Sequence, residues 1–257
     1  MIDIHSHVLP GVDDGAPTAA VSLEMLARAG AEGIRAAVLT PHVRPEDGEE
    51  RDALHRARFA ELQSAAAGLP VVLHLGAEVA FRFNLAAVAA WPSVGLAGTR
   101  FVLVDLPPGP LSPSLEQGLF ELRTAGYRPI LAHPERQREL ARQAELVARL
   151  RQQEVLVQVD AGSLTGQFGR RARAAALDWL GRGWVDYVAS DGHDLVRRPM
   201  SLLAARRQVE AAVGAEEARW LLEGNPGRLL EGAEPHRREP SPARPARGWR
   251  RLFGWLP

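Results

Sequence analysis

The sequence contains no cysteine, and this absence excludes disulfides, thiolate metal sites and any cysteine nucleophile. Protein phosphatases that work through a thiol are excluded with them. Lysine is absent as well, so all 31 basic residues are arginine and a Walker phosphate loop, which requires lysine, is impossible. No stretch approaches the roughly 18 apolar residues of a membrane-spanning helix. The first residues have no basic segment followed by an apolar one, so we expect no signal peptide and a cytoplasmic protein.

The chain also lacks a net charge, because its 31 arginines are balanced by 31 acidic residues. Without a broad cationic field, the arginine content does not indicate nucleic-acid binding, and we expect no nucleic-acid partner. A chain of 257 residues, 46% of them hydrophobic, is long enough to form one large domain with a substantial core.

Short β-type segments alternate with amphipathic or alanine-rich segments along most of the chain. A helix is expected from Thr18 to Gly30, and another has Ser112 as its N-cap, Pro113 at its first position and Gly126 as its stop. Strands that alternate with helices imply a parallel sheet, either closed into a barrel or open and doubly wound. The seven predicted strands are "MIDIH", "RAAVLT", "VVLHLGAE", "FVLVDLP", "PILAH", "VLVQVDA" and "VDYVAS".

Polar side chains stand at or just after the carboxyl ends of six of these strands. In a barrel these ends meet around one mouth, whereas an open sheet spreads them along an edge, so their placement favours the barrel. His5 and His7 are two residues apart on a strand, so their side chains point the same way and can hold a metal ion together. The candidate metal ligands are His5, His7, Asp14, His42, Glu78, Asp105, His133, Asp191 and His193.

These ligands mix imidazoles with carboxylates and include no thiolate, a donor set that suits manganese, iron or zinc. Nine ligands exceed the four to six that one ion uses, so we expect two or three divalent ions. Such ions lower the pKa of bound water to about 7 and can clamp the attacking and leaving oxygens of a displacement, which predicts hydrolysis. The other histidines, His55, His74 and His236, are expected to have structural or solvent-exposed roles.

Around these ligands the chain carries "HSHVLPGVDDG", "TPH", "GAEV", "AHPER", "AGSLTGQFG", and "ASDGHD" followed by "RRP". In this order the motifs resemble the bacterial PHP-type protein-tyrosine phosphatases of capsular and exopolysaccharide operons, from Met1 to about Leu230. The resemblance implies a distorted seven-stranded, TIM-like (β/α)7 barrel with a trinuclear, usually manganese-dependent site. The substrate it implies is the phosphotyrosine tail of the autophosphorylating tyrosine kinase that governs polysaccharide export.

The resemblance also distributes the ligands over three ions: His5, His7, Glu78 and Asp191; Glu78 again, with Asp105 and His133; and Asp14, His42 and His193. Position 105 is usually Glu in the family, and the shorter Asp draws its oxygens back from the second ion. Arg136 and Arg198 match the family's substrate arginines, with Arg197 as a competitor for the second role. A planar guanidinium can bind two phosphate oxygens at once.

The motif "AGSLTGQFG" follows the sixth strand and forms either a loop over the site or a plain connection. Asp160, just before it, is a reserve metal ligand. The expected reaction is attack of hydroxide on phosphorus without a covalent enzyme intermediate. Alternatives are a PHP phosphoesterase acting on a small metabolite such as histidinol phosphate, a metal-binding regulatory module that has lost catalysis, and, more remotely, a PHP exonuclease.

Residues 1–232 are expected to form the phosphatase domain, and residues 233–257 a flexible tail rich in proline and arginine. The final segment, "GWRRLFGWLP", joins basic side chains to aromatic and aliphatic ones, a composition suited to weak contact with an anionic membrane surface or a partner groove. A solvated tail is the alternative. The sequence leaves open the metal identity, the cognate kinase and whether the chain forms a homo-oligomer.

Overall fold

Nine parallel strands form two sheets in the computed structural model, which describes residues 1–82 and 85–239. The strand order is β1-β2-β4 in one sheet and β3-β5-β6-β7-β8-β9 in the other. The strands are β1 (Ile2–Ser6), β2 (Ala36–Leu39), β3 (His42–Val43), β4 (Val72–Leu75), β5 (Glu78–Ala80), β6 (Phe101–Asp105), β7 (Arg128–Ala132), β8 (Leu156–Asp160) and β9 (Tyr187–Ala189).

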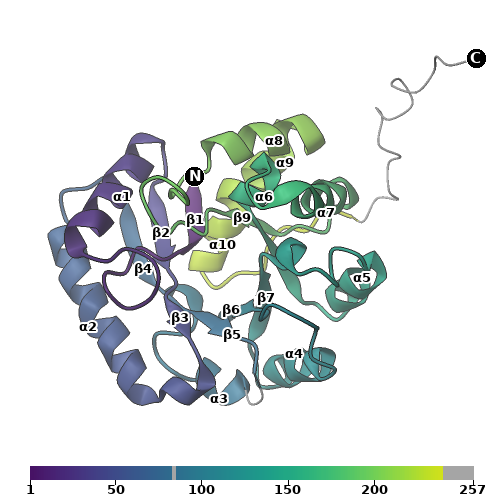
Figure 1. Ribbon diagram of the computed structural model, residues 1–257, viewed down its shortest axis with the longest axis horizontal. Helices are drawn as coiled ribbons and strands as arrows, with labels where there is room; N and C mark the ends of the chain where they lie inside the picture. Colours follow the sequence, from purple (N-terminus) through teal and green to yellow (C-terminus); the bar gives the residue numbers. More distant parts are fainter. Residues whose placement is uncertain (83–84, 240–257) are drawn as a thin grey trace, which may run out of the picture.

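Helices surround the strands in Figure 1, as expected for a parallel α/β fold. Within the described ranges, no helix has both the length and the apolar character needed to cross a membrane. The α-helices are α1 (Ala19–Ala31), α2 (Glu49–Ala65), α3 (Leu85–Ala89), α4 (Leu115–Thr124), α5 (Ala144–Gln152), α6 (Ala161–Thr165), α7 (Gly169–Arg182), α8 (Leu203–Val213), α9 (Ala215–Arg219) and α10 (Asn225–Leu230). Short 3₁₀ helices span Pro45–Asp47, Leu96–Gly98 and Pro134–Arg136, and a π-helical segment spans Trp220–Gly224.

The third predicted strand is split into β4 and β5, and a short strand that was not predicted, β3, follows the second predicted strand. Between β2 and β3 lies Pro41, which has no N–H to donate to a neighbouring strand. Between β4 and β5 the chain changes partner, since the Gly76 N–H bonds to the Leu39 carbonyl while the Ala77 N–H bonds to the Val94 carbonyl. The α/β class and the parallel strands are confirmed, but the described residues form two sheets and not one continuous, closed seven-stranded barrel.

The observed helices begin and end where local backbone and capping hydrogen bonds form, which is not always where the sequence predicts. Helix α1 begins after Thr18, whose hydroxyl accepts from the Val21 N–H, close to the predicted start. Helix α4 begins at Leu115, so the prediction of Pro113 as its first residue is wrong. The Ser112 carbonyl accepts from the Leu115 N–H and closes a turn ahead of the helix. Gly126 follows the helix in the left-handed region, as its stop role requires.

Two apolar clusters hold the strands in place. The smaller consists mostly of strand residues, among them Ile2 and Ile4 of β1 and Tyr187 of β9. The larger packs strand residues against helices and includes the fully buried Trp179 of α7. A fully buried large apolar side chain contributes about 1.5–3 kcal/mol to stability. The ends of the strands are therefore anchored in a well-packed apolar core.

Residues 233–239, the first part of the predicted tail, contact the domain. The Glu234 carboxylate forms ion pairs with two arginines, and the His236 N–H donates to the Asn225 side-chain oxygen over 2.7 Å. Residues 233–239 therefore pack against the domain, beyond the predicted boundary at residue 232. The rest of the tail, residues 240–257, lies outside the described residues.

Candidate metal centre

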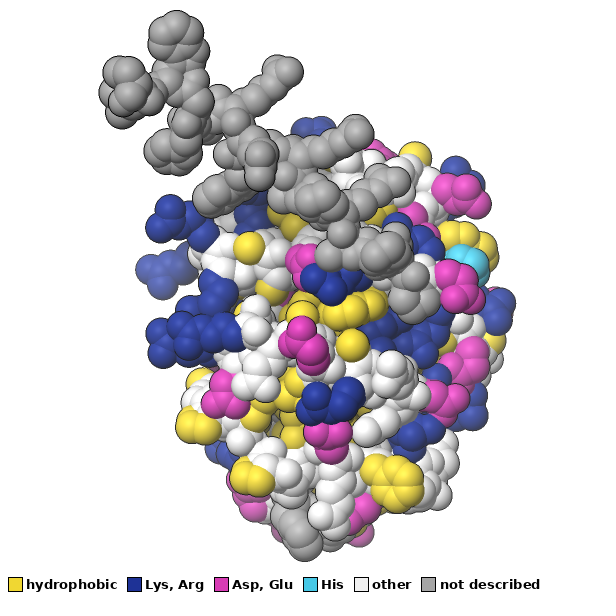
Figure 2. Space-filling model, turned by 90° about the vertical axis from the view of Figure 1, so that its right-hand side faces the viewer, with side chains coloured by type: hydrophobic (Ala, Val, Ile, Leu, Met, Phe, Trp, Pro, Cys, Tyr) yellow, Lys and Arg dark blue, Asp and Glu magenta, His cyan; other side chains and the backbone are white. Residues whose placement is uncertain are grey.

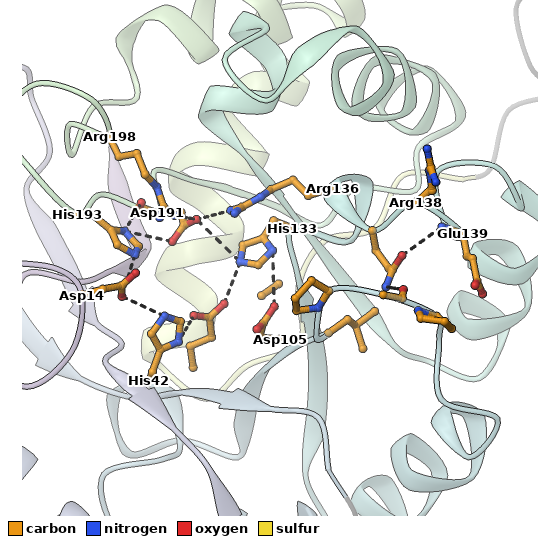
Figure 3. A pocket seen from close by; sticks show the side chains of 17 residues that line it. Asp14, His42, Asp105, His133, Arg136, Arg138, Glu139, Asp191, His193 and Arg198 are labelled. Carbon is orange, nitrogen blue, oxygen red and sulfur yellow. Dashed lines mark hydrogen bonds and ion pairs between the residues drawn. The ribbon is translucent and has the colours of Figure 1, made fainter.

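The nine predicted metal ligands lie close together at the carboxyl ends of the strands. Seven of them line a cavity of about 700 Å³, together with the two candidate substrate arginines (Figure 3). Eight of the nine fall into three groups whose ligand atoms lie within 4.8 Å of one another: His7, Asp14, His42 and His193; His5, His7 and Asp191; and His5, Glu78 and His133.

Asp105 stands slightly apart from these groups. Its Oδ1 is 3.9 Å from the Nδ1 atom of His133, and no described metal-binding group includes it. Burial, together with the nearby Glu78 charge, raises the pKa of Asp105. A retracted carboxylate is what the shorter side chain at this position predicts.

The outer nitrogens of His5 and His7 determine how their rings face the centre. Nδ1 of His5 is 2.9 Å from the Gln158 Oε1 atom, and Nδ1 of His7 is 2.8 Å from an Asp13 carboxylate oxygen. Both partners are acceptors, so each Nδ1 carries a proton and Nε2 is the atom that faces inward, where it offers a lone pair whenever the ring is neutral. The two Nε2 atoms lie only 3.2 Å apart. Two lone pairs at this distance fit a shared cation, with the outer partners fixing the tautomers as they do in metal sites.

Two buried carboxylates, those of Glu78 and Asp191, supply the negative charge at the centre; each is 1% exposed. Glu78 lies 2.9 Å from a ring nitrogen of His42 and 2.9 Å from one of His133. Burial alone would raise the pKa of Glu78, but His5 and the other surrounding imidazoles hold it well below its usual range. A buried carboxylate is costly unless it is paired in this way.

The pKa values of His5 and His7 are raised, whereas that of Glu78 is lowered. Burial lowers the pKa of His5, but the Glu78 and Asp191 charges outweigh it and raise the value to about 9. His7 is also buried, yet its hydrogen bonds to Asp13 and Asp191 raise its pKa well above the ordinary value. Protons on these rings therefore balance the buried carboxylates, and divalent cations are a chemically equivalent replacement.

Unusual backbone places several of these side chains. His133 has φ 33° and Asp191 has φ 51°, both in the left-handed region that non-glycine residues rarely adopt. The register of β1 against β2 shifts between Asp3 and Ser6, which re-aims the histidine pair as β-bulges do beside active sites. Gly15 lets the following loop fold back on His7, since a Cβ there would lie 1.9 Å from the His7 carbonyl oxygen.

Arg136 and Arg198 reach the same carboxylate oxygen. Nη1 of Arg136 is 2.6 Å from Oδ2 of Asp191, and Nη2 of Arg198 bonds to that oxygen as well. Arg198 lines the cavity, whereas its competitor Arg197 is exposed and does not. Asp160, the reserve ligand, accepts from the Gly162 N–H and from Arg136 and belongs to none of the three groups.

Three residues that shape the site were not predicted from the sequence. Asp13 orients His7 and also accepts from the His42 N–H; burial opposes its charge, but the hydrogen bond from His7 lowers its pKa to about 2. Gln158 orients His5, and Phe168 lies against the arginines. Asp13 stands in "VDDG" beside a predicted ligand, and Phe168 in "AGSLTGQFG", but nothing in the sequence singles out Gln158.

The remaining histidines stay outside the ligand groups. His55 of α2 is fully buried, with no hydrogen-bond partner for its ring nitrogens among the described residues, and burial lowers its pKa to about 4. His74 of β4 is half-buried, and burial lowers its pKa too. The ring of His236 stacks on Trp220 with centroids 4.5 Å apart. All three occupy the structural positions expected for them.

Solved structures with a similar fold include metal-dependent phosphatases. One matching chain comes from the work described as "Crystal structures of YwqE from Bacillus subtilis and CpsB from Streptococcus pneumoniae, unique metal-dependent tyrosine phosphatases", with a TM-score of 0.82 and 29% identity. That match covers 95% of this chain and 100% of the other. An organophosphorus hydrolase variant from Deinococcus radiodurans, at 18% identity and a TM-score of 0.53 over 89% of this chain and 92% of the other, shares the fold alone.

Sequence comparisons give a consistent result over the whole chain. Tyrosine-protein phosphatase YwqE of Bacillus subtilis is 31% identical over the full length of both proteins. Tyrosine-protein phosphatase CpsB of Streptococcus pneumoniae is 28% identical, over 90% of this chain and 98% of its own. The model of the family described as "Capsular polysaccharide synthesis, CpsB/CapC" matches residues 1–231. With its histidines and acids gathered at the strand ends, the chain belongs to the CpsB/CapC family of capsular polysaccharide synthesis.

Proposed function

We propose that the chain is a metal-dependent phosphotyrosine-protein phosphatase that acts on the autophosphorylated tyrosine kinase controlling capsular or exopolysaccharide synthesis and export. One observation carries the proposal: two arginines meet a cluster of imidazoles and buried carboxylates at the edge of one cavity. Similarity to tyrosine-protein phosphatases over the whole chain supports it. The absence of cysteine rules out a cysteinyl-phosphate intermediate.

The resident cofactors in this proposal are two or three divalent ions, with manganese as the expected metal and iron or zinc as alternatives. The inward lone pairs of His5 and His7 fit a cation, and the nitrogen and oxygen donors around them suit these metals. Such ions, when bound, lower the pKa of coordinated water and offset the negative charge of phosphate. We keep all nine predicted residues as ligands, with Asp105 as the weakest.

Arg136 and Arg198 bind the phosphate in this proposal. Their guanidinium groups converge on Asp191 Oδ2 at the cavity, so phosphate oxygens placed there would meet two charged donors. Charge-assisted hydrogen bonds of this kind are strong, and they stabilise charge on the phosphoryl oxygens in the transition state. Asp13 and Gln158 keep the imidazoles oriented during turnover by holding their outer nitrogens.

The far side of the cavity suits a peptide substrate. Its wall includes Leu106, Pro108 and Gly109, and the Gln137 side-chain amide holds this loop by donating to the Gly109 carbonyl over 2.9 Å. A volume of about 700 Å³ lies within the usual range for small-molecule sites and accommodates a phosphotyrosine side chain. The tyrosyl oxygen, whose parent phenol has a pKa near 10, leaves more easily than an alkoxide.

Hydrolysis rates on three substrates test the proposal. The full chain is assayed on a phosphotyrosine peptide, histidinol phosphate and an oligonucleotide, each with manganese and with a chelator. We expect manganese-dependent hydrolysis of the peptide at a kcat/KM at least tenfold above that of the other two. A preference for histidinol phosphate would favour the small-metabolite alternative, and metal binding without hydrolysis would favour a regulatory module.

We also infer that the two sheets together make one distorted (β/α)7 barrel of the PHP type. A bridge between Ser6 and Gly192 joins the end of β1 to the segment after β9, and the Asp191 N–H donates to the His5 carbonyl over 2.9 Å. At the other junction the Glu78 N–H donates to the Pro41 carbonyl over 3.1 Å. These bonds support a ring of strands interrupted where the metal ligands stand.

A further inference from the structure

Phe168 lies against both of the arginines that face the cavity. The Arg136 guanidinium carbon is 4.2 Å from the centroid of the Phe168 ring, and that of Arg198 is 5.8 Å from the same centroid. Phe168 belongs to the "AGSLTGQFG" motif and stands between α6 and α7. One aromatic ring therefore contacts two cationic groups that come from different strand ends.

An aromatic ring beneath two guanidinium groups offsets their mutual repulsion. Its negative face attracts cations within about 6 Å of the centroid, which is the range of both contacts. Among the described residues, Oδ2 of Asp191 is the one carboxylate oxygen that both arginines bond. If that carboxylate turned to another partner, the ring would still contact both guanidinium groups.

The ring itself is held firmly. A Cβ at position 162 would lie 2.7 Å from the Cε2 atom of Phe168, so Gly162 allows the ring to pack closely over α6. The neighbouring Gln167 side chain donates to the Arg197 carbonyl over 2.6 Å, which ties this motif to the loop carrying Arg198. The ring and the second arginine are therefore parts of one locally fixed unit.

Phe168 lies behind the arginines, away from the main cavity. The residues that line the cavity of about 700 Å³ do not include it. It lines a separate pocket of about 120 Å³, of which Arg198 forms the shared wall. A substrate phosphate in the main cavity would meet the guanidinium groups and not the ring.

We propose that Phe168 is a positioning residue that holds the guanidinium groups of Arg136 and Arg198 at the separation and tilt needed to bind one phosphate. The inference rests on the proposed function for the identity of the anion. It gives the "AGSLTGQFG" motif a defined role, which is to support the phosphate-binding pair from behind.

Three variants of the full chain, loaded with manganese, test this role: Phe168→Leu, Phe168→Tyr and Trp184→Leu. Leucine removes the aromatic face, and tyrosine keeps it. Trp184 is the matched control, because its ring lies 4.8 Å from the Arg182 guanidinium carbon, outside the site. KM and kcat for a phosphotyrosine peptide, the competitive inhibition constant of inorganic phosphate and the melting temperature are measured for each.

We expect Phe168→Leu to raise both KM and the phosphate inhibition constant about tenfold, consistent with two cation–π contacts. We expect kcat to change less than about threefold, since binding is lost equally in the ground and transition states. Phe168→Tyr and Trp184→Leu should stay near wild type in these constants. This pattern would separate positioning from a general loss of folding, which moves the melting temperature instead.

Three results would overturn the inference. The first is unchanged KM and phosphate inhibition in folded Phe168→Leu. The second is a higher KM for the peptide without weaker phosphate inhibition, which would mean that the ring touches the substrate. The third is a loss in Phe168→Tyr as large as in the leucine variant. If the wild-type protein hydrolyses no phosphotyrosine, the proposed function fails. The role of Phe168 is then tested by calorimetric titration with inorganic phosphate. Equal phosphate affinities of the wild type and Phe168→Leu would overturn this role, and a tenfold weaker affinity in Phe168→Leu would support it.

Discussion

Hydrogen bonds to their outer nitrogens orient individual histidine rings at the site. His7 donates from Nδ1 to Asp13, an acid that also accepts from the His42 N–H and belongs to none of the ligand groups, and so presents Nε2 to the centre. His193 does the same with a backbone partner, since its Nδ1 lies 2.8 Å from the Asp191 carbonyl oxygen. A ring whose outer nitrogen is fixed needs no reorientation when a cation arrives. Pre-orientation of this kind is built into the fold before any ion binds.

Adjacent arginines in the loop after β9 have different expected roles. Arg198→Ala should lower kcat/KM for a phosphotyrosine peptide by about 10²–10³-fold, because a charge-assisted contact to the phosphoryl oxygens is lost in the transition state. Arg197→Ala removes an exposed side chain of the same charge and should stay within about twofold of wild type. Steady-state kinetics with manganese, alongside melting temperatures, make the comparison. Equal losses in the two variants would show that the loop's charge matters and not the position of one guanidinium.

The strand and helix pattern could be predicted because hydrophobic spacing is local information. Each of the seven predicted strands overlaps an observed strand, and the polar residues at their ends lie together. Strand β3, just after Pro41, was not predicted, because two residues are too few to show a hydrophobic period. The start of α4 was missed because a turn at Ser112 competes with capping there.

The supporting side chains of the site were harder to predict than the ligands. Gln158 is 153 residues from His5 in the sequence. The two meet because β8 lies beside β9 and the segment after β9 is bridged to the end of β1. Phe168 likewise meets its arginines through tertiary packing. A ligand is recognisable by its chemistry at a strand end, whereas a residue that orients a ligand has no chemical signature of its own.

The turn between β1 and α1 depends on glycine at position 15. A Cβ there would overlap the His7 carbonyl, so Gly15→Ala must push the Asp13 loop away and should destabilise the protein by about 1–3 kcal/mol. Gly181→Ala is the matched control, because it lies inside α7 with open space around the added methyl and should stabilise by up to about 1 kcal/mol. Urea unfolding measures both. Wild-type stability in Gly15→Ala would mean that the loop is not pinned to His7.

Charged side chains are distributed differently on the surface and in the interior of the molecule. On the face shown in Figure 2, arginine side chains gather along the left edge, and acidic and apolar side chains are interspersed with arginines over the lower part. The centre instead concentrates buried acids and imidazoles whose charges depend on one another. Changes of pH in the moderate range therefore act on the stability of the whole molecule mainly through this interior cluster.

Without metal, the protons on the cluster stabilise the fold over a limited pH window. The folded-state pKa of His5 is about 9 and that of His7 lies well above its ordinary value of 6.5, so their contribution is complete below pH 6.5 and is lost as the pH rises through 9. The pKa values of Glu78 and Asp191 are depressed, so their contribution is present above about pH 4.5 and is lost in acid. The Met1 amino group, whose pKa burial lowers, acts in the direction opposite to the histidines.

The melting temperature of the chelated protein should therefore fall between pH 6.5 and pH 9. With saturating manganese it should fall much less, because metal ligands bind in their deprotonated form and affinity rises as protons leave. Differential scanning calorimetry at both pH values, with chelator and with manganese, measures the two slopes, and Asp191→Asn, which removes one of the charges that raises the His5 pKa, should flatten the slope in chelator. A chelated wild-type protein that melts at the same or a higher temperature at pH 9 would contradict the protonated cluster, because its buried carboxylates would then be balanced in some other way.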